Sequence, residues 1–309
     1  STIWYNAINS STGALSSWGT TTPLEAAALL NPVLTAYNGR LYSIGGTTLG
    51  SNSHTSSTGY VSINSNGTIG FWALNSFDDL PVGLGNHSIV AKNGYLYVIG
   101  GVPDGGATAT STVLYAALDP TDGSIGAWSN TTALPVARKN HAAFERNGNI
   151  YVFGGGSPSS ATSSILYAPI NSDGSLGNWT TTNTPLPVAV TSALDTLSNS
   201  KNYFYLNMDT TSYYSLLENN DFNWATTTPI SHLLSQSQYA ATIYNGYLYV
   251  SGGSYINGLE QYVATSTVIY SPIYNDRSSK DIFWGLAVPN GSQIGTYSGT
   301  VNFTGSYNP

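Results

Sequence analysis

The ten residues YNGYLYVSGG, residues 244–253, decide the fold because near copies of them occur three more times along the chain. Each copy holds an Asn-Gly pair between two segments of alternating character, which predicts a β-hairpin with a type I′ turn. The glycine pair that ends each copy indicates a backbone that packs closely or turns where a Cβ would not fit. The other copies are YNGRLYSIGG (37–46), KNGYLYVIGG (92–101) and RNGNIYVFGG (146–155).

A second motif accompanies the hairpins and ends on a tryptophan. It predicts two further strands around an Asp-Gly or Asn-Gly turn, so the repeating unit has four antiparallel strands. The copies read STGYVSINSNGTIGFW (57–72), TSTVLYAALDPTDGSIGAW (110–128) and TSSILYAPINSDGSLGNW (162–179). Tryptophans at this position lie 45 to 60 residues apart, namely Trp18, Trp72, Trp128, Trp179, Trp224 and Trp284.

Four-stranded units of about 50 residues have the kelch period of β-propeller blades. The chain resembles kelch-repeat β-propellers in its glycine pair after an apolar strand, the Tyr-containing strand that follows, and the Trp with a proline-bearing turn behind it. DGSIGAW followed by TTALP is similar to kelch-like repeats of exported prokaryotic proteins. The resemblance covers essentially the whole chain and implies one all-β domain, a six-bladed propeller. Its predicted blades are 290–309 with 1–24, 29–80, 84–134, 138–186, 188–228 and 236–288.

The first blade begins at its third strand, in TIWYNAINSSTGALSSW (2–18). Its missing hairpin is predicted near the C-terminus, where IGTYSGTVNFTGS (294–306) aligns with ATIYNGYLYVSGG (241–253). One blade would then take strands three and four from the N-terminal segment and strands one and two from the C-terminal segment, which removes open edges. The alternative is exchange, in which the segment of one molecule completes the blade of its neighbour.

One blade departs from the pattern between Ser192 and Asp209. It keeps a hairpin with a longer turn, but Asn207-Met208 stand where the glycine pair is expected. We therefore expect an altered exit from its second strand.

Composition excludes several classes of function. Charged residues make up 7% of the 309 residues, the net charge is −7, and no run of Lys or Arg could neutralise a nucleic acid backbone. The chain has no cysteine, which excludes disulfides, thiolate metal sites and the Cys-dependent cofactor of copper-radical oxidases, which also use kelch propellers. No apolar run is long enough to span a bilayer. Few lysines, many Ser and Thr, and a start at Ser1 indicate an exported chain with its signal removed, at the cell surface or outside the cell.

The candidate ligand-binding residues lie near the expected central channel. His87 and His141 each precede a turn glycine by seven residues, and Arg138 stands close to His141. An arginine there could clamp an acidic sugar, but it could equally bind loop carbonyls and hold the blades in register. The two histidines are explained by repeat ancestry, so we predict no metal or other cofactor.

A second candidate surface consists of the loops between the second and third strands, at 47–58, 102–111, 156–163 and 254–266. The last loop carries Tyr255 and Tyr262, and Tyr239 begins the innermost strand of the same blade. Tyrosines beside amide side chains suit sugar or protein faces. Asn-x-Ser/Thr sequons are glycosylation candidates in an exported chain, and they begin at Asn9, Asn66, Asn86, Asn130, Asn178, Asn290 and Asn302.

No pair of acids with glycosidase spacing, no nucleophile elbow and no phosphate loop is evident. We therefore interpret the chain as a non-enzymatic structural or adhesive module that binds protein, its own copies or a glycan. It could be a filament subunit joined by exchanged terminal strands. The alternative is a carbohydrate-binding or carbohydrate-active propeller, an isomerase or hydrolase with its site around Arg138 and His141.

Overall fold

The structure is a computed structural model, and the regular structure it describes is entirely β-strand and turn, as the sequence predicts. The residues described are 3–5, 7, 14–17, 19–21, 29–30, 33–48, 53–74, 79–157, 160–190, 196–198, 203–207, 212–227, 239–244, 247–252, 254–256, 262–264 and 268–272.

Four sheets have four antiparallel strands each, and within every sheet the strands pair in chain order. A fifth sheet has three described strands. The first sheet comprises β4 (Val33–Tyr37), β5 (Arg40–Ile44), β7 (Thr58–Ser62) and β8 (Ala73–Leu74); the second β10 (Ser88–Lys92), β11 (Tyr95–Ile99), β13 (Val113–Ala117) and β14 (Ser129–Asn130); the third β15 (Ala142–Arg146), β16 (Asn149–Phe153), β19 (Ile165–Pro169) and β20 (Thr180–Thr181); the fourth β21 (Thr196–Ser198), β22 (Tyr203–Asn207), β23 (Ser212–Glu218) and β24 (Asp221–Thr227); and the fifth β25 (Tyr239–Tyr244), β26 (Tyr247–Gly252) and β29 (Val268–Pro272).

The first hairpin of three sheets turns at the predicted Asn-Gly pair. Asn38, Asn93 and Asn147 have φ of 46°, 51° and 52°, and the glycine after each also has positive φ, as a type I′ turn requires. The glycine pairs that begin at Gly45, Gly100 and Gly154 lie in the same left-handed region. The fourth predicted turn, at residues 245–246, lies outside the described residues.

The N-terminal strands form a two-stranded antiparallel sheet whose register can be compared with that of the complete blades. In β1 (Ile3–Tyr5) and β2 (Gly19–Thr21), Tyr5 pairs with Gly19, the residue after the tryptophan. Tyr115 pairs in the same way with Ser129, directly after Trp128. β1 and β2 therefore have the register of a third and a fourth strand. The segment predicted to supply the inner pair, 294–306, lies outside the described residues.

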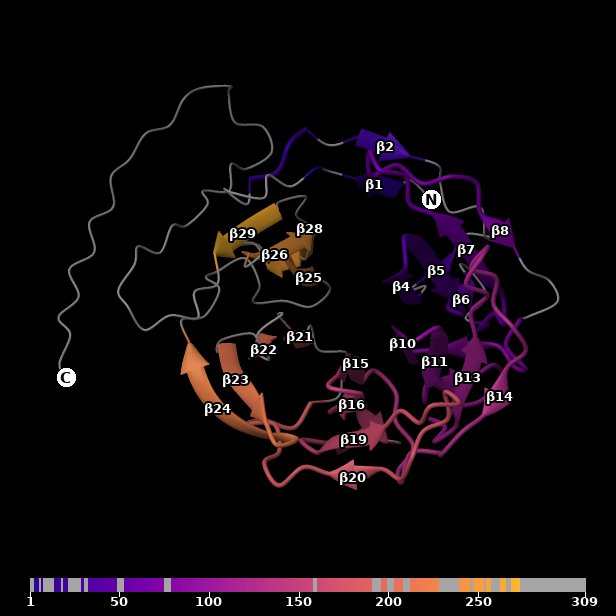
Figure 1. Cartoon of the computed structure of the whole chain (residues 1–309). Coiled ribbons are helices and arrows are strands. Elements are labelled where there is room, and N and C mark those ends of the chain that lie inside the picture. Colours follow the sequence, from indigo (N-terminus) through magenta and orange to yellow (C-terminus); the bar gives the residue numbers. More distant parts are fainter. Residues whose placement is uncertain are drawn as a thin grey trace, which may run out of the picture.

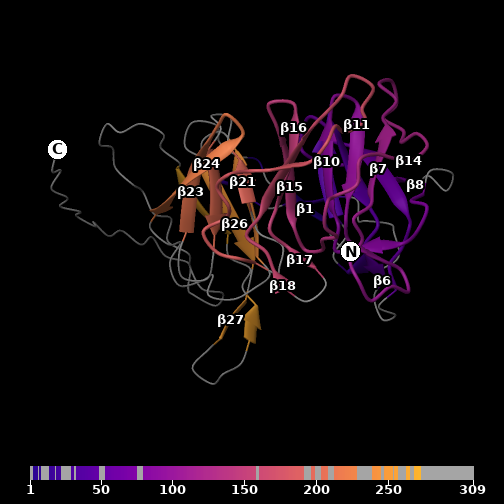
Figure 2. The same ribbon diagram turned by 90° about the horizontal axis from the view of Figure 1, so that it is seen from below.

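Each of four short two-stranded ladders has at least one strand in a loop between second and third strands. In Figure 2, β6, β17, β18 and β27 all lie on the same side of the molecule, which we call the loop face; the side with the Asn-Gly turns is the turn face. The ladders are β3 (Leu29–Leu30) with β6 (Thr47–Thr48), β9 (Leu84–Gly85) with β12 (Val102–Pro103), β17 (Gly156–Ser157) with β18 (Ser160–Ala161), and β27 (Ser254–Ile256) with β28 (Tyr262–Ala264).

The sheets stand side by side around a common axis (Figure 1). Strands β4, β10, β15, β21 and β25 lie nearest the axis, and β8, β14, β20 and β24 lie at the rim. The buried side chains pack between neighbouring sheets: one cluster joins the first sheet to the second, another the second to the third, and another the third to the fourth. Burial of apolar area between sheets is the main term that stabilises this arrangement.

Tyrosines of the second strand add a hydrogen bond across each of these junctions. The hydroxyl of Tyr42 donates to the Gly123 carbonyl at 3.1 Å, and that of Tyr97 to the Gly174 carbonyl at 2.8 Å. Tyr151 donates to Asn220 Oδ1 at 2.6 Å. Each acceptor lies in the turn between the third and fourth strands of the next sheet. The Asp-Gly and Asn-Asn turns therefore serve as docking points for the preceding blade.

The departure predicted between Ser192 and Asp209 concerns the fourth sheet. Its β21–β22 hairpin is present, with a turn longer than two residues between Ser198 and Tyr203. β22 ends at Asn207 and β23 begins at Ser212, so the loop between them is shorter than in the other blades. Met208 itself lies outside the described residues.

Candidate functional site

The two histidines lie where the repeat phase predicts, directly before the innermost strands β10 and β15. Both are buried, with 5% of His87 and 3% of His141 exposed. Nε2 of His141 lies 2.7 Å from Oγ of Ser88, which joins the starts of two neighbouring innermost strands. Within the part of the chain that the structure describes, the two ring nitrogens of His87 and Nδ1 of His141 have no hydrogen bond of standard geometry.

The glycine pairs provide the space that these histidines occupy. A Cβ added to Gly45 would lie 2.9 Å from Cε1 of His87, and one added to Gly100 would lie 2.9 Å from Cε1 of His141. The second glycine packs on the histidine of its own sheet, because a Cβ on Gly101 would lie 2.7 Å from Cβ of His87. At these two junctions, the first glycine of one sheet therefore packs against the histidine of the next sheet.

The next junction uses a different side chain for the same purpose. There the first glycine, Gly154, packs against Val190 and Leu186 instead of an imidazole. An apolar side chain can thus fill the position. This comparison favours the interpretation of His87 and His141 as packing residues.

Burial has a strong effect on both imidazoles. Desolvation lowers the pKa of His87 to about 4, and nearby His54 adds to this shift while the backbone of Ile44 opposes it. Desolvation, with further contributions from Arg138 and His87, lowers the pKa of His141 to about 3. Both rings are therefore neutral at neutral pH.

Arg138 is also buried, and its guanidinium binds the protein itself. Nη1 donates to the carbonyls of Gly154 and Ser164 at 2.9 and 3.0 Å, and Nη2 donates to Oγ of Ser164 at 2.6 Å. Its backbone carbonyl accepts from Gly101 of the preceding sheet at 2.8 Å. Burial lowers the pKa of Arg138 to about 10, so the side chain stays protonated. This is the geometry of a brace between loop and blade, one of the two interpretations that the sequence left open.

No family model and no curated protein matches the sequence. Among solved structures, "Structure of YjhT" describes a bacterial kelch-repeat β-propeller protein that is similar to this chain with a TM-score of 0.65. The match covers 92% of this chain and 91% of that chain at 13% sequence identity. The fold is a β-propeller of the kelch type. At this identity the similarity concerns the fold alone.

Among the residues that the structure describes, the loop face of the propeller holds few charges. Its acids are engaged with backbone, since Asp79 Oδ1 accepts from Thr58 N at 2.9 Å and Asp104 Oδ1 accepts from His54 N at 2.7 Å. The other charged residues described there are Arg138 and Lys139. The turn face and its strand ends hold Arg40, Lys92, Asp119, Asp122, Glu145, Arg146, Asp173, Glu218 and Asp221.

The loop face also presents a repeated apolar residue. Three linkers that lead into the next blade read Leu-Pro-Val, and in each the leucine is buried while the valine is exposed. The exposed fractions are 43% for Val82, 56% for Val136 and 41% for Val188. The leucine N–H groups donate to loop carbonyls between second and third strands, for example Leu134 N to Ser111 O at 2.9 Å. The linkers and loops together form one surface.

The remaining candidate ligand-binding residues belong to the fifth sheet and its loop. Tyr239 begins β25, Tyr255 lies in β27 and Tyr262 in β28, with Tyr255 opposite Val263 in the ladder. Their side chains lie outside what the structure describes. The prediction that these tyrosines bind a ligand stays a prediction, as does the one for Arg138, His87 and His141.

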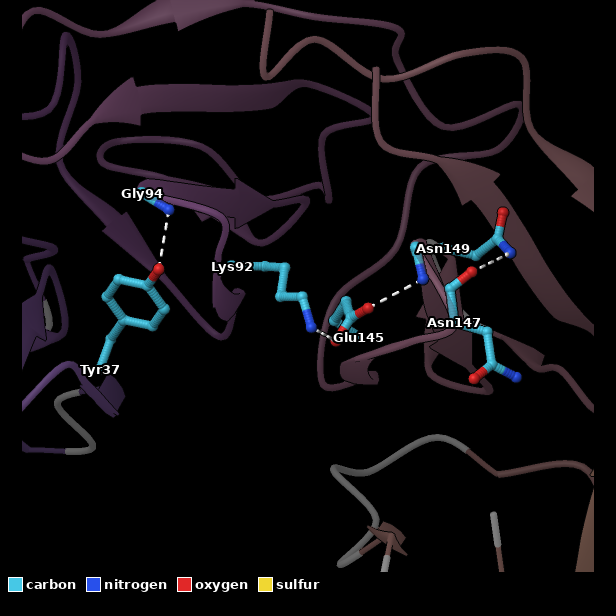
Figure 3. Close-up of polar contacts among 7 residues, drawn as sticks. Tyr37, Lys92, Gly94, Glu145, Asn147 and Asn149 are labelled. Carbon is cyan, nitrogen blue, oxygen red and sulfur yellow. Dashed lines mark hydrogen bonds and ion pairs between the residues drawn. The ribbon is translucent and has the colours of Figure 1, made fainter. Parts of the chain in front are cut away.

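On the turn face, a side chain hydrogen-bonds to an Asn-Gly turn. In one case the side chain comes from the neighbouring blade, and in another it comes from the same blade (Figure 3). The Gly94 N–H donates to the hydroxyl of Tyr37 at 2.9 Å, across the junction between the first and second sheets. Lys92 Nζ lies 2.8 Å from Glu145 Oε2, across the next junction. The second oxygen of Glu145 accepts from Gly148 N at 2.9 Å. Sequence reasoning missed these contacts, although the position before each Asn-Gly pair carries a Tyr, Lys or Arg in every copy.

The sequons differ in accessibility. Asn66, Asn130 and Asn178 are exposed, whereas Asn86 is partly buried at a blade junction, where its carbonyl accepts from Asn140 N at 2.9 Å. Asn9, Asn290 and Asn302 lie outside the described residues.

Within the described residues, no group of three His, Asp or Glu side chains is placed to hold a metal ion. No helix long and apolar enough to cross a membrane occurs in that part of the chain.

Proposed function

We propose that this propeller is a non-catalytic interaction module at the cell surface or outside the cell, whose incomplete blade is finished by the hairpin at 294–306. The observation that carries the proposal is the register of β1 and β2, in which Tyr5 pairs with the residue after a tryptophan as in the complete blades. An outer strand pair without inner strands has an open edge of backbone N–H and C=O groups, which favours pairing with another strand.

The donor of the inner pair determines what the module builds. A donor hairpin from the same chain closes a single propeller. A donor hairpin from a neighbouring copy joins propellers head to tail, and because such an interface does not close on itself it extends into a filament. A single fold thus serves as either a free-standing adhesive module or a filament subunit.

The loop face supports the role in binding. Its exposed Val82, Val136 and Val188 stand in a surface of hydroxyls, amides and few charges. Apolar contacts within a neutral polar surround suit a protein or glycan face better than a charged polymer. The partner class we propose is therefore protein, including copies of the chain, or glycan.

The rival function, a carbohydrate-active site around Arg138 and His141, has less support. The Arg138 guanidinium already donates three hydrogen bonds to Gly154 and Ser164, and the His141 ring is packed between two blades. Turnover of a sugar that disappears in Arg138→Ala, with an unchanged melting temperature, would favour the rival.

An engineered disulfide tests the proposal. Because the chain has no cysteine, no native thiol can pair with the two that are introduced. In the second sheet Tyr115, the counterpart of Tyr5, pairs with Tyr97. The counterpart of Tyr97 in the segment 294–306 is Asn302. Directly opposite positions of antiparallel strands have Cα atoms about 4.5–5.5 Å apart, within disulfide range. The variant is Tyr5→Cys with Asn302→Cys.

The variant is oxidised in native buffer and analysed by mass without reductant. A cross-linked monomer supports closure within the chain, and a ladder of multimers supports exchange between copies. Tyr5→Cys with Val301→Cys is the matched control, because a shift of one residue turns the side chain to the other face of the strand. Equal cross-linking in both double variants, or none in either, would contradict the proposal.

A further inference from the structure

Three Asn-Gly turns of the turn face form a chemically matched set. Asn38, Asn93 and Asn147 are all exposed and all have positive φ in the same type I′ turn. The space beside the glycines is also alike, since a Cβ added to Gly94 or Gly148 would meet nothing within 4 Å, and the same holds for Gly39. The turns differ in what binds the glycine N–H.

An Asn-Gly pair can undergo spontaneous deamidation. The backbone nitrogen of the glycine loses its proton and attacks Cγ of the asparagine, a C–N bond forms, and the side-chain nitrogen leaves as ammonia. Water then opens the resulting succinimide to aspartate or isoaspartate, without any change of oxidation state. Glycine permits this attack because it has no Cβ to obstruct it. The attack requires that the glycine N–H be released from its hydrogen bond.

Two of the turns hold that N–H with a side chain. Gly94 N donates to the Tyr37 hydroxyl at 2.9 Å, and Gly148 N donates to Glu145 Oε1 at 2.9 Å. Lys92 fixes the carboxylate from the neighbouring blade at 2.8 Å. A carboxylate next to the amide also opposes the negative charge that the nitrogen must acquire. Figure 3 shows the Tyr37–Gly94 hydrogen bond and the Lys92–Glu145 ion pair.

We propose that Asn93 and Asn147 are latent deamidation sites, and that Tyr37 and Glu145 protect them by holding the N–H of the following glycine. Once protection is lost, deamidation adds one negative charge at the modified turn, close to the Lys92–Glu145 ion pair. Where isoaspartate forms, the main chain gains one atom in a turn that fixes the register of an innermost hairpin. The blade would then weaken at its turn.

The experiment compares site-by-site deamidation of the full chain with that of two variants, in mildly alkaline buffer, by peptide mapping and isoaspartate assay. Tyr37→Phe keeps the ring that packs in the first core cluster and removes only the hydroxyl. It is expected to raise the rate at Asn93 about threefold to tenfold, the ratio that corresponds to one hydrogen bond of ordinary net strength. Asn147 is expected to be unchanged.

Glu145→Ala is the reciprocal variant and is expected to raise the rate at Asn147 by at least as much, with Asn93 unchanged. Glu145→Gln retains a hydrogen-bond acceptor without the charge. Its deamidation rate at Asn147 should therefore lie between those of the unmodified chain and of Glu145→Ala. In urea all three turns should deamidate alike in every variant, which shows that the fold supplies the protection. If both turns accelerate together in each variant, or if neither does, the proposal is wrong.

Discussion

In this fold the neutral form of a buried imidazole is favoured, because burial removes the water that would stabilise its charged form. His87 and His141 reach this state through desolvation, with pKa values of about 4 and about 3. In the unfolded chain a histidine has a pKa of about 6.5. Between these values the unfolded state binds more protons, so stability falls as the pH falls below about 6.5 and the loss ends once the folded pKa is passed.

We therefore expect the free energy of unfolding to drop by roughly 2 kcal/mol for each of the two histidines between pH 7 and pH 5. Denaturant titrations at pH 7, 6 and 5 measure it. This window lies above the range of the carboxyl groups, and at Asp122, Asp173 and Asp221 hydrogen bonds from side chains and backbone N–H groups hold the pKa low. In His87→Leu with His141→Leu the slope should flatten, whatever the absolute stability, because Val190 shows that an apolar side chain fits such a junction. An unchanged slope would refute the assignment.

At the scale of elements, the geometry that recurs is a tyrosine of one blade hydrogen-bonded to a turn of the next. Tyr97 is fully buried, its hydroxyl donates to the Gly174 carbonyl, and burial raises its pKa well above the usual range. A buried carbonyl that loses its donor remains desolvated without a hydrogen bond, which destabilises the folded state. The bond therefore stabilises the junction beyond the apolar contacts around it.

Tyr97→Phe is expected to lower the free energy of unfolding by about 1–3 kcal/mol, because the Gly174 carbonyl is left without its donor in a buried site. Tyr115→Phe is the control, since Tyr115 stacks on Tyr97 with ring centres 6.4 Å apart and would keep that contact without its hydroxyl. Thermal or urea unfolding measures both. Equal losses in the two variants would mean that the hydroxyl of Tyr97 contributes nothing specific.

The elements themselves could be predicted from the sequence, but their contacts across junctions could not. Asn-Gly pairs and period-two patterns determine local structure, so the hairpins and the tryptophan-bearing strands could be predicted from the sequence. The partner of Tyr97 lies 77 residues away in another blade, and no local pattern encodes that distance. The same holds for Arg138, whose hydrogen bonds to Gly154 and Ser164, 16 and 26 residues away, could not be predicted from the local sequence.

At the scale of the whole molecule, the propeller consists of similar junctions and, as we propose, one blade of divided origin. The inner hairpin of a complete blade connects to its third strand through a loop, as β11 connects to β13. For β1 we propose that the inner hairpin comes from 294–306, the segment that aligns with the inner hairpins of the other blades. Repeat counting predicts this division from the sequence, and the division stays a prediction. It could not predict the donor, since donors from the same and from another molecule make identical strand contacts.

A circular permutant removes the ambiguity. Joining Pro309 to Ser1 through a short Gly-Ser linker, with new ends in the exposed turn at Asp104-Gly105, makes the inner hairpin and β1 continuous, as in the other blades. Since a linked hairpin has a far higher effective concentration than one on another molecule, closure within the chain should dominate. If the parent chain forms polymers by exchange, the permutant is expected to be a monomer of unchanged strand content by light scattering and circular dichroism. Polymers that persist in the permutant would mean that the copies meet through another surface, and the loop face with Val82, Val136 and Val188 would be the first to substitute.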